Sequence, residues 1–134
     1  MESVIEIHDS IATCCKEQGG RIAIRLSPAW LHRAPSKPGI APGDVYTLDA
    51  DVILDNAKFR RRFNELPTEL QTGSISVAGN RFDNCIPFPF ESATATTLLL
   101  VDYLGRPVEL LAEKLTIVAA GEENYVEAFP GIDS

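Results

Sequence analysis

The sequence predicts a single mainly β domain spanning residues 1–134, a sandwich or partly open barrel of hairpins and meanders with one short helix near residues 57–65. Apolar and polar residues alternate with a period of two along several short segments, which is typical of half-buried strands. Glycine, proline and asparagine separate these segments and supply turn chemistry. A parallel α/β sheet is disfavoured because it needs a helix of about ten residues or more between its strands.

The first predicted elements are a short strand and a hairpin. Residues 4–7, Val-Ile-Glu-Ile, form a short run that indicates a strand. Residues 11–16 and 21–26 then flank a polar stretch that ends in Gly19 and Gly20, which indicates a hairpin. In the second arm the apolar side chains alternate with polar or small ones, so one face is predicted to enter the core and the other to face water.

Residues 27–43 predict an ordered loop. Six residues in this stretch oppose a ladder or a helix: Pro28, Pro35, Pro38, Gly39, Pro42 and Gly43. Trp30 is predicted to be substantially buried and to hold the loop from Pro28 to Gly43 against the sheet. Loops of this length within a compact domain are disproportionately functional.

The next stretch contains the longest strict alternation in the chain. One face of a strand over residues 46–54 collects Tyr46, Leu48, Ala50, Val52 and Leu54, and the other face collects Asp49, Asp51 and Asp55. After Asn56, a plausible helix N-cap, Phe59, Phe63 and Leu66 recur at i, i+4 and i+7. This spacing predicts the short helix over residues 57–65.

The second half of the chain predicts further hairpins. Residues 74–77 and 81–82 are predicted to pair, and residues 87–90 are predicted to leave the sheet because they contain two prolines. Residues 97–101 are apolar throughout, which indicates a central strand. Together with residues 108–111, 115–120 and 125–129 they are predicted to form a meander.

Composition limits the class of protein and its partners. Nineteen acidic and 12 basic residues give a net charge of −7, which disfavours binding to nucleic acid or to anionic membranes and favours a basic partner. No basic, apolar signal sequence or membrane-spanning run is seen, so the protein is expected to be cytoplasmic. Three cysteines suit no closed disulfide framework and are expected to be reduced. The sequence fits a monomer or a homodimer equally. The apolar strand at residues 97–101 would have to be covered by a second subunit only if it lay at an edge of the sheet.

Residue types with catalytic potential occur without the spacing that catalysis requires. His8, Asp9 and Ser10 are the residue types of a hydrolase triad, but consecutive strand residues alternate faces, so the side chains of His8 and Asp9 are predicted not to form a nucleophile-base relay with each other. No nucleophile elbow, phosphate-binding loop or closely spaced pair of metal ligands is present in the sequence. We therefore expect no catalytic residue, no metal site and no cofactor, which favours a non-enzymatic role.

Two surfaces remain as candidate sites. The first is the predicted outward row Asp49, Asp51 and Asp55, which would attract a basic protein. The second is a ligand site under the Pro28 to Gly43 loop, built from His8, Asp9, Trp30 and His32.

Several motifs together resemble a group of small uncharacterised bacterial β-rich proteins. The motifs are His8-Asp9-Ser10 near the start, Asn84-Cys85-Ile86-Pro87-Phe88-Pro89, and the closing Tyr125-Val126-Glu127-Ala128-Phe129-Pro130-Gly131. More loosely, the opening tripeptide followed by a hairpin is similar to small bacterial toxin-immunity proteins. This resemblance implies a compact, mainly β bacterial protein and brings no catalytic residues with it.

The sequence thus predicts a non-catalytic protein-binding module, with an immunity-like inhibitor of a basic toxin as one form of it. The alternative is a small-molecule binding or hydrolytic protein with its site under the Pro28 to Gly43 loop.

Overall fold

The computed structural model describes residues 1–132, which contain thirteen strands; strands make up 67% of these residues, and none of them forms a helix. The strands are β1 (Glu2–Glu6), β2 (Ile11–Gln18), β3 (Arg21–Ala34), β4 (Gly43–Asp55), β5 (Lys58–Arg61), β6 (Thr68–Val77), β7 (Asn80–Asp83), β8 (Cys85–Pro87), β9 (Phe90–Ser92), β10 (Thr96–Asp102), β11 (Pro107–Ala112), β12 (Lys114–Ala119) and β13 (Asn124–Phe129). The prediction of a mainly β chain is confirmed.

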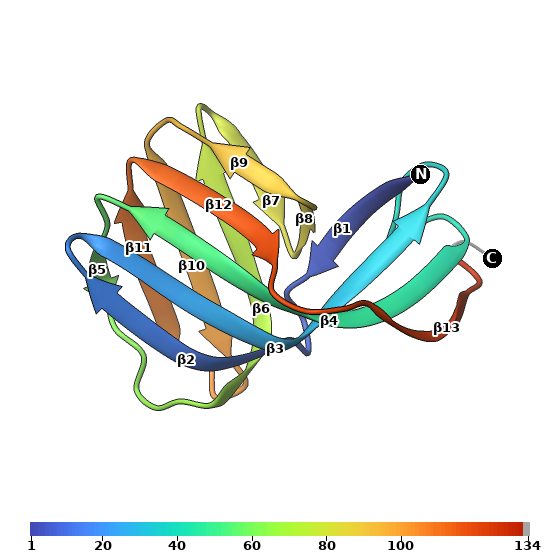
Figure 1. Cartoon of the computed structure of the whole chain (residues 1–134), viewed down its shortest axis with the longest axis horizontal. Helices are drawn as coiled ribbons and strands as arrows, with labels where there is room; N and C mark the ends of the chain where they lie inside the picture. Colours follow the sequence, from blue (N-terminus) through green and yellow to red (C-terminus); the bar gives the residue numbers. More distant parts are fainter. Residues whose placement is uncertain (133–134) are drawn as a thin grey trace.

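All strands belong to one open antiparallel sheet. Its main path runs β5-β11-β10-β6-β2-β3-β4-β12-β9, and β1, β7, β8 and β13 attach to the sides of this path (Figure 1). The two halves are joined by a short pairing of β2 with β6, in which Ile11 and Ala12 lie opposite Glu69 and Thr68. The path does not close on itself, so the sheet retains edge strands.

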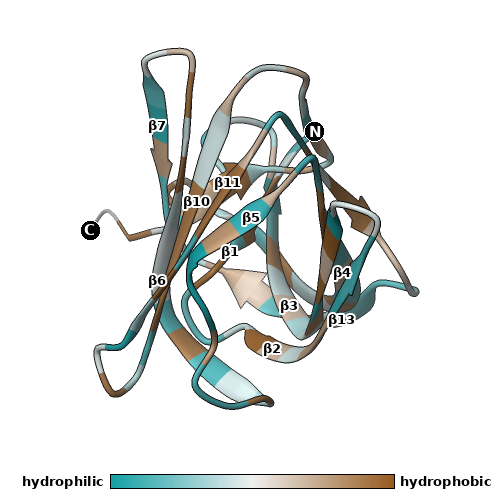
Figure 2. Cartoon of the chain, turned by 90° about the vertical axis from the view of Figure 1, so that its left-hand side faces the viewer, coloured by the Kyte–Doolittle hydropathy of each residue, from teal (hydrophilic) through white to brown (hydrophobic). Residues whose placement is uncertain are grey.

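The sheet curls so that its two halves enclose a shared apolar interior (Figure 2). Buried side chains from both halves form one hydrophobic cluster, with Leu26 and Leu54 from one half and Ile75 and Leu110 from the other. This cluster supplies the main drive for folding, since each fully buried leucine or isoleucine contributes on the order of 2 kcal/mol relative to exposure.

Several predicted strands and hairpins are confirmed. β2 pairs with β3, β6 with β7, and β10 with β11, each with the next strand along the chain. In β4 the predicted inward residues Leu48, Ala50, Val52 and Leu54 are buried. Tyr46 is an exception, because Val45 is buried in its place and Tyr46 is half-buried.

The predicted helix at residues 57–65 is wrong. Lys58–Arg61 form strand β5, which pairs with β11 through Phe59 and Leu110. The rings of Phe59 and Phe63 still meet, with centroids 6.3 Å apart, and both pack against the core. Pairing with β11 satisfies the backbone and buries the same side chains, so tertiary context overrides a weak helical preference.

The predicted loop from Ser27 to Gly43 is also too long. Strand β3 continues to Ala34, so the connection to β4 comprises only residues 35–42. Pro28 lies at a register shift between Leu26 and Ala29, where the β3–β4 ladder is already interrupted. A proline is tolerated at such an irregularity, and pairing resumes after it with β4 on one side and β1 on the other.

The predicted C-terminal meander is wrong beyond its first hairpin. Within the described residues, β11 pairs with β10 and β5, β12 with β4 and β9, and β13 with β4. Residues 87–90 do not leave the sheet entirely, because Pro87 ends β8 and Phe90 begins β9. β8 and β9 are three-residue strands at edges of the sheet, and a proline such as Pro87 is tolerated in an edge strand.

Candidate functional site

The three carboxylates predicted to attract a partner lie on the outer face of β4, but the neighbouring strand supplies cations opposite two of them. Arg25 of β3 binds Asp51 with two hydrogen bonds, one of them 3.1 Å from Nη2 to Oδ2. Arg21 Nε donates to Asp55 Oδ1 at 2.7 Å, and Ser27 Oγ donates to Asp49 Oδ1 at 2.5 Å. The hydrogen bond to Asp51 raises the pKa of Arg25. Two of the three acids are therefore neutralised within the protein.

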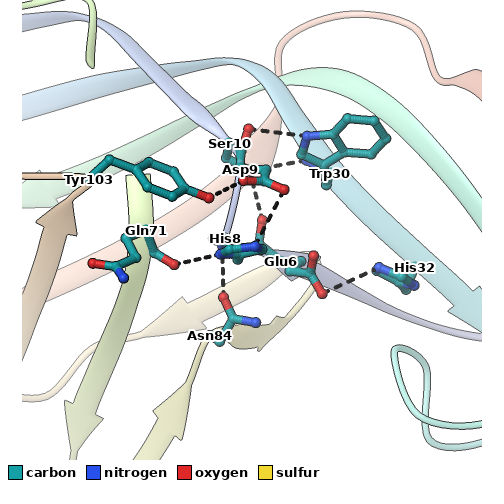
Figure 3. Close-up of polar contacts among 9 residues, drawn as sticks. All are labelled: Glu6, His8, Asp9, Ser10, Trp30, His32, Gln71, Asn84 and Tyr103. Atoms are coloured by element: carbon teal, nitrogen blue, oxygen red, sulfur yellow. Dashed lines mark hydrogen bonds and ion pairs between the residues drawn. The ribbon is translucent and has the colours of Figure 1, made fainter. Parts of the chain in front are cut away.

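The alternative ligand residues fall into two groups (Figure 3). The first group surrounds Asp9, which lies in the turn between β1 and β2. Trp30 Nε1 donates to the Asp9 carbonyl oxygen at 3.1 Å, and the Tyr103 hydroxyl donates to the Asp9 carboxylate. His8 Nδ1 lies 2.7 Å from the carbonyl oxygen of Gln71. The hydrogen bond to Asp9 raises the pKa of Tyr103 to about 12, so the phenol keeps its proton and remains the donor.

His32 belongs to the other group. Its side chain is 9% exposed, and Nε2 lies 3.5 Å from Glu6 Oε2. Its ring packs edge-on against Phe129 with centroids 4.9 Å apart. The structure thus brings His8, Asp9 and Trp30 together but sets His32 on the other side of Glu6 (Figure 3). Four surface pockets have linings that include none of these four residues.

The premise that His8 and Asp9 lie on opposite faces of a strand is wrong. Both lie in a turn, where Asp9 adopts a φ of 68° and its Oδ2 is 3.4 Å from His8 Nε2. A triad is nevertheless not assembled, because Ser10 is fully buried. Its Oγ donates to the Glu6 carbonyl at 2.7 Å and accepts from the Trp30 backbone N–H at 3.1 Å. Within residues 1–132 no cluster of three or more metal-ligating side chains occurs.

The prediction that Trp30 anchors a loop is wrong. Trp30 lies within β3 rather than in a loop, and its side chain is half-buried. It joins the β1–β2 turn to β3 through its hydrogen bond to Asp9.

A different part of the molecule stands out by its charge. We define the acidic arm as residues 1–6, 27–49 and 120–132, which lie together at the N-terminal end of the molecule, at the right in Figure 1. It carries two basic residues, Arg33 and Lys37. Its seven acidic residues are Glu2, Glu6, Asp44, Asp49, Glu122, Glu123 and Glu127. These seven carboxylates against two cations give the arm five of the seven net negative charges of the chain.

The acidic arm also carries most of the large apolar side chains that the described residues leave exposed. Five of the seven belong to it: Met1, Ile40, Tyr125, Val126 and Ile132. Tyr125 is 60% exposed although its ring packs edge-on against Tyr46, with centroids 5.7 Å apart. Where exposed apolar side chains gather into one patch, they often mark an interaction surface.

Arg33 fixes the acidic arm internally. Its guanidinium donates two 2.7 Å hydrogen bonds to Glu123 and one of 2.9 Å to Ser3 Oγ, and it lies 5.0 Å from the centre of the Tyr46 ring. These contacts hold the pKa of Glu123 below its usual value, chiefly through the Arg33 hydrogen bonds. Arg33 also lines an open pocket of about 550 Å³ with Glu2 and Phe88. Arg33 is thus occupied by Glu123, while Glu2, Glu122 and Glu127 of the arm are exposed to solvent.

Sequence reasoning did not identify the acidic arm, because its charges come from three separated segments. Glu122, Glu123 and Glu127 near the last strand were the available signal. Comparisons with protein-family models, curated proteins and solved structures found no match to this chain. Residues 1–132 also form no helix that is long and apolar enough to cross a membrane.

Proposed function

We propose that this chain is a non-catalytic protein-binding module and that its acidic arm engages a basic protein. The observation that carries the proposal is the coincidence, in one part of the molecule, of five net negative charges and most of the exposed large apolar side chains. Apolar contact area would stabilise a complex, and the carboxylates would select a basic partner and raise the rate of association.

Charge distribution favours the acidic arm over the outer face of β4. On that face Arg21 forms an ion pair with Asp55, and Arg25 forms one with Asp51. In the arm, no ion pair of the described residues involves Glu2, Asp44, Glu122 or Glu127. A partner that meets the arm therefore gains charge pairs without first breaking internal ones, whereas a partner on β4 would compete with arginine.

The same charges disfavour a second copy of this chain as the partner. Two acidic arms in contact would bring about ten net negative charges together, and like charges across an interface cost several kcal/mol. A basic toxin, the class of partner to which the sequence resemblance points, would suit the arm.

Site-specific crosslinking tests this proposal. Tyr125 is replaced by the photoreactive analogue p-benzoyl-phenylalanine, and Leu104, an exposed apolar residue outside the arm, is replaced in a control chain. After irradiation in cells of the source organism, we expect Tyr125 to capture a basic protein that Leu104 does not capture. Glu122→Lys/Glu127→Lys should abolish this capture at low salt.

The matched control is Glu91→Lys/Glu113→Lys, which changes the net charge equally at exposed positions outside the arm. This variant should retain capture. Equal effects of both charge reversals, or an acidic captured protein, would overturn the proposal.

A further inference from the structure

We propose that the segment of the partner bound by the acidic arm is an extended basic strand that adds to the free edge of β13. This inference rests on the proposed function and specifies how the arm recognises its partner. Strand addition takes its affinity from main-chain hydrogen bonds and its specificity from alternating side chains.

β13 differs from the other edge strands of the described sheet. β5 carries Lys58, Arg60 and Arg61 within four residues, and β7 carries Arg81 and Asp83. β8 and β9 are three residues long. Charges and shortness are the usual protection of an edge against unwanted pairing. β13 is longer, with six residues that include no lysine, arginine or proline, and its protection is limited to one acidic residue, Glu127, and one bulge.

The outer edge of β13 is open to solvent. Five of its six residues are exposed, and within residues 1–132 its only strand partner is β4. Its backbone N–H and C=O groups on the far side from β4 therefore have no ladder partner among the described residues. An added strand would complete these hydrogen bonds.

The strand is held in place at both ends, which keeps the edge ready for pairing. Near its start Tyr125 packs on Tyr46, and at its end Phe129 packs on the buried ring of His32. Just beyond it, the backbone N–H of Ile132 donates to the Ile40 carbonyl oxygen at 3.0 Å. A preformed edge spares the complex the entropic cost of ordering its own strand.

The side chains around this edge define the chemistry of the partner strand. Glu122 precedes β13, Glu127 lies within it, and Asp44 is opposite Ala128 on β4. Val126 and Tyr125 add exposed apolar surface. A segment that alternates lysine or arginine with β-branched residues matches both features, since its basic side chains share one face and its apolar side chains share the other.

One feature of β13 limits where pairing is regular. The register against β4 shifts between Tyr125 and Glu127, which makes Val126 the extra residue of a bulge. Bulges bend a strand and re-aim a side chain. We therefore place the main-chain hydrogen bonds to the partner along Glu127–Phe129. At Val126 we expect contact through side chains alone.

The test uses a nine-residue peptide that alternates lysine and valine, with blocked ends. A second peptide has the same sequence with four consecutive central amides N-methylated, which blocks both of its hydrogen-bonding edges and keeps its charges. We expect the first peptide to bind saturably and the second to bind at least about tenfold more weakly, the loss expected for about two main-chain hydrogen bonds.

Hydrogen exchange locates the contact. Binding of the unmethylated peptide should slow exchange in residues 124–129 and not in the edge strands β5 and β9. Glu122→Lys/Glu127→Lys should weaken binding about tenfold at low salt, and Glu91→Lys/Glu113→Lys should leave it unchanged.

The outcomes separate this inference from the proposed function. If the methylated peptide binds as tightly as its parent and both still depend on Glu122 and Glu127, strand addition is overturned and the acidic arm remains the binding surface. If neither peptide binds up to about 1 mM, strand addition by a basic segment is also overturned, and the Tyr125 crosslinking result decides the function of the arm independently.

Discussion

Asp102 shows how a single side chain closes a turn. It ends β10, its side chain is 8% exposed, and its carboxylate accepts hydrogen bonds from the backbone N–H groups of Leu104 and Arg106, each 2.9 Å long. Arg106 Nε donates a third bond of 2.7 Å. Burial alone would raise the pKa of Asp102, but the hydrogen bonds from Arg106 and Leu104 outweigh burial and hold this pKa below its ordinary value.

Asp102→Asn should therefore lower the free energy of unfolding by about 2 to 4 kcal/mol at pH 7. Because the folded-state pKa is depressed, the stabilisation by Asp102 is present above the unfolded pKa of about 3.9 and is lost as the pH falls through the folded value. Urea unfolding at pH 7 and near pH 3 should show the difference from wild type shrinking with acid. Asp83→Asn, which alters an exposed carboxylate, should change stability by less than about 0.5 kcal/mol at both pH values. A difference for Asp102→Asn that does not depend on pH would contradict this account.

Trp30 is the second residue whose role can be measured. Since its side chain is half-buried, Trp30→Ala should cost about 2 kcal/mol, less than the 3 to 5 kcal/mol typical of a fully buried aromatic residue. For a chain of this size this loss lowers the midpoint of thermal unfolding by about 6 to 10 °C. Trp30→Phe keeps part of the packing but removes the donor to Asp9, so it should fall between wild type and Trp30→Ala. A midpoint within a degree of wild type for Trp30→Ala would show that the residue does not join the turn to β3.

At the scale of elements, the pairing of β3 with β4 builds the acidic arm. We call the part of the molecule outside the acidic arm the body. The two strands run together from Ile22 and Leu54 in the body to Arg33 and Asp44 in the arm. Gly43 begins β4 where a Cβ atom would collide with the Arg33 carbonyl oxygen and lie 2.8 Å from Ala34 Cβ. Backbone cannot yield as a flexible side chain can, so the close approach of the two strands requires glycine at this position.

Gly43→Ala should consequently destabilise the protein by about 1 to 3 kcal/mol and loosen the arm end of the β3–β4 pair. Gly121→Ala is the matched control, because its Cβ atom would find its nearest neighbour, Asp49 Cβ, at an ordinary 3.6 Å. Thermal unfolding should separate the two variants by several degrees. Equal midpoints would show that β3 can move away from Gly43 without cost.

At the scale of the whole molecule, apolar burial and net charge are unevenly distributed. The body holds most of the buried core, whereas β13 has no buried residue and the arm holds most of the net charge. Local opening costs least where few apolar contacts are lost. Within the acidic arm, β13 therefore has the fewest buried apolar contacts to lose on local opening, although Tyr125 and Phe129 anchor its two ends.

Hydrogen exchange of the free protein should reveal this difference. Amides of β13 that are paired with β4 should exchange at least about tenfold faster than those in the body section of β4, since their opening breaks fewer buried contacts. High salt should reduce the gap, because it screens the repulsion among the carboxylates of the arm. Equal protection along the whole of β4 and β13 would mean that the arm and the body open together.

The sequence by itself determined the elements whose pattern is local. Alternation identified β4 and the second arm of the β2–β3 hairpin, and Gly-containing turns identified the β6–β7 and β10–β11 hairpins. Such signals are reliable because the period of two follows from the strand itself and a short turn brings its own neighbours together. Net charge likewise indicated a basic partner, which stays a prediction.

Only the tertiary structure decided which distant strands meet, and the site depends on that pairing. Phe59 lies in a strand because β11 is beside it, and β12 and β13 lie against β4 instead of forming a meander. Asp51 and Asp55 are neutralised because Arg25 and Arg21 face them from β3, which the composition of β4 alone does not reveal. The acidic arm draws its charge from three segments separated by 20 and 70 residues of sequence. The free energy of long-range pairing, and not local preference, brings these segments together.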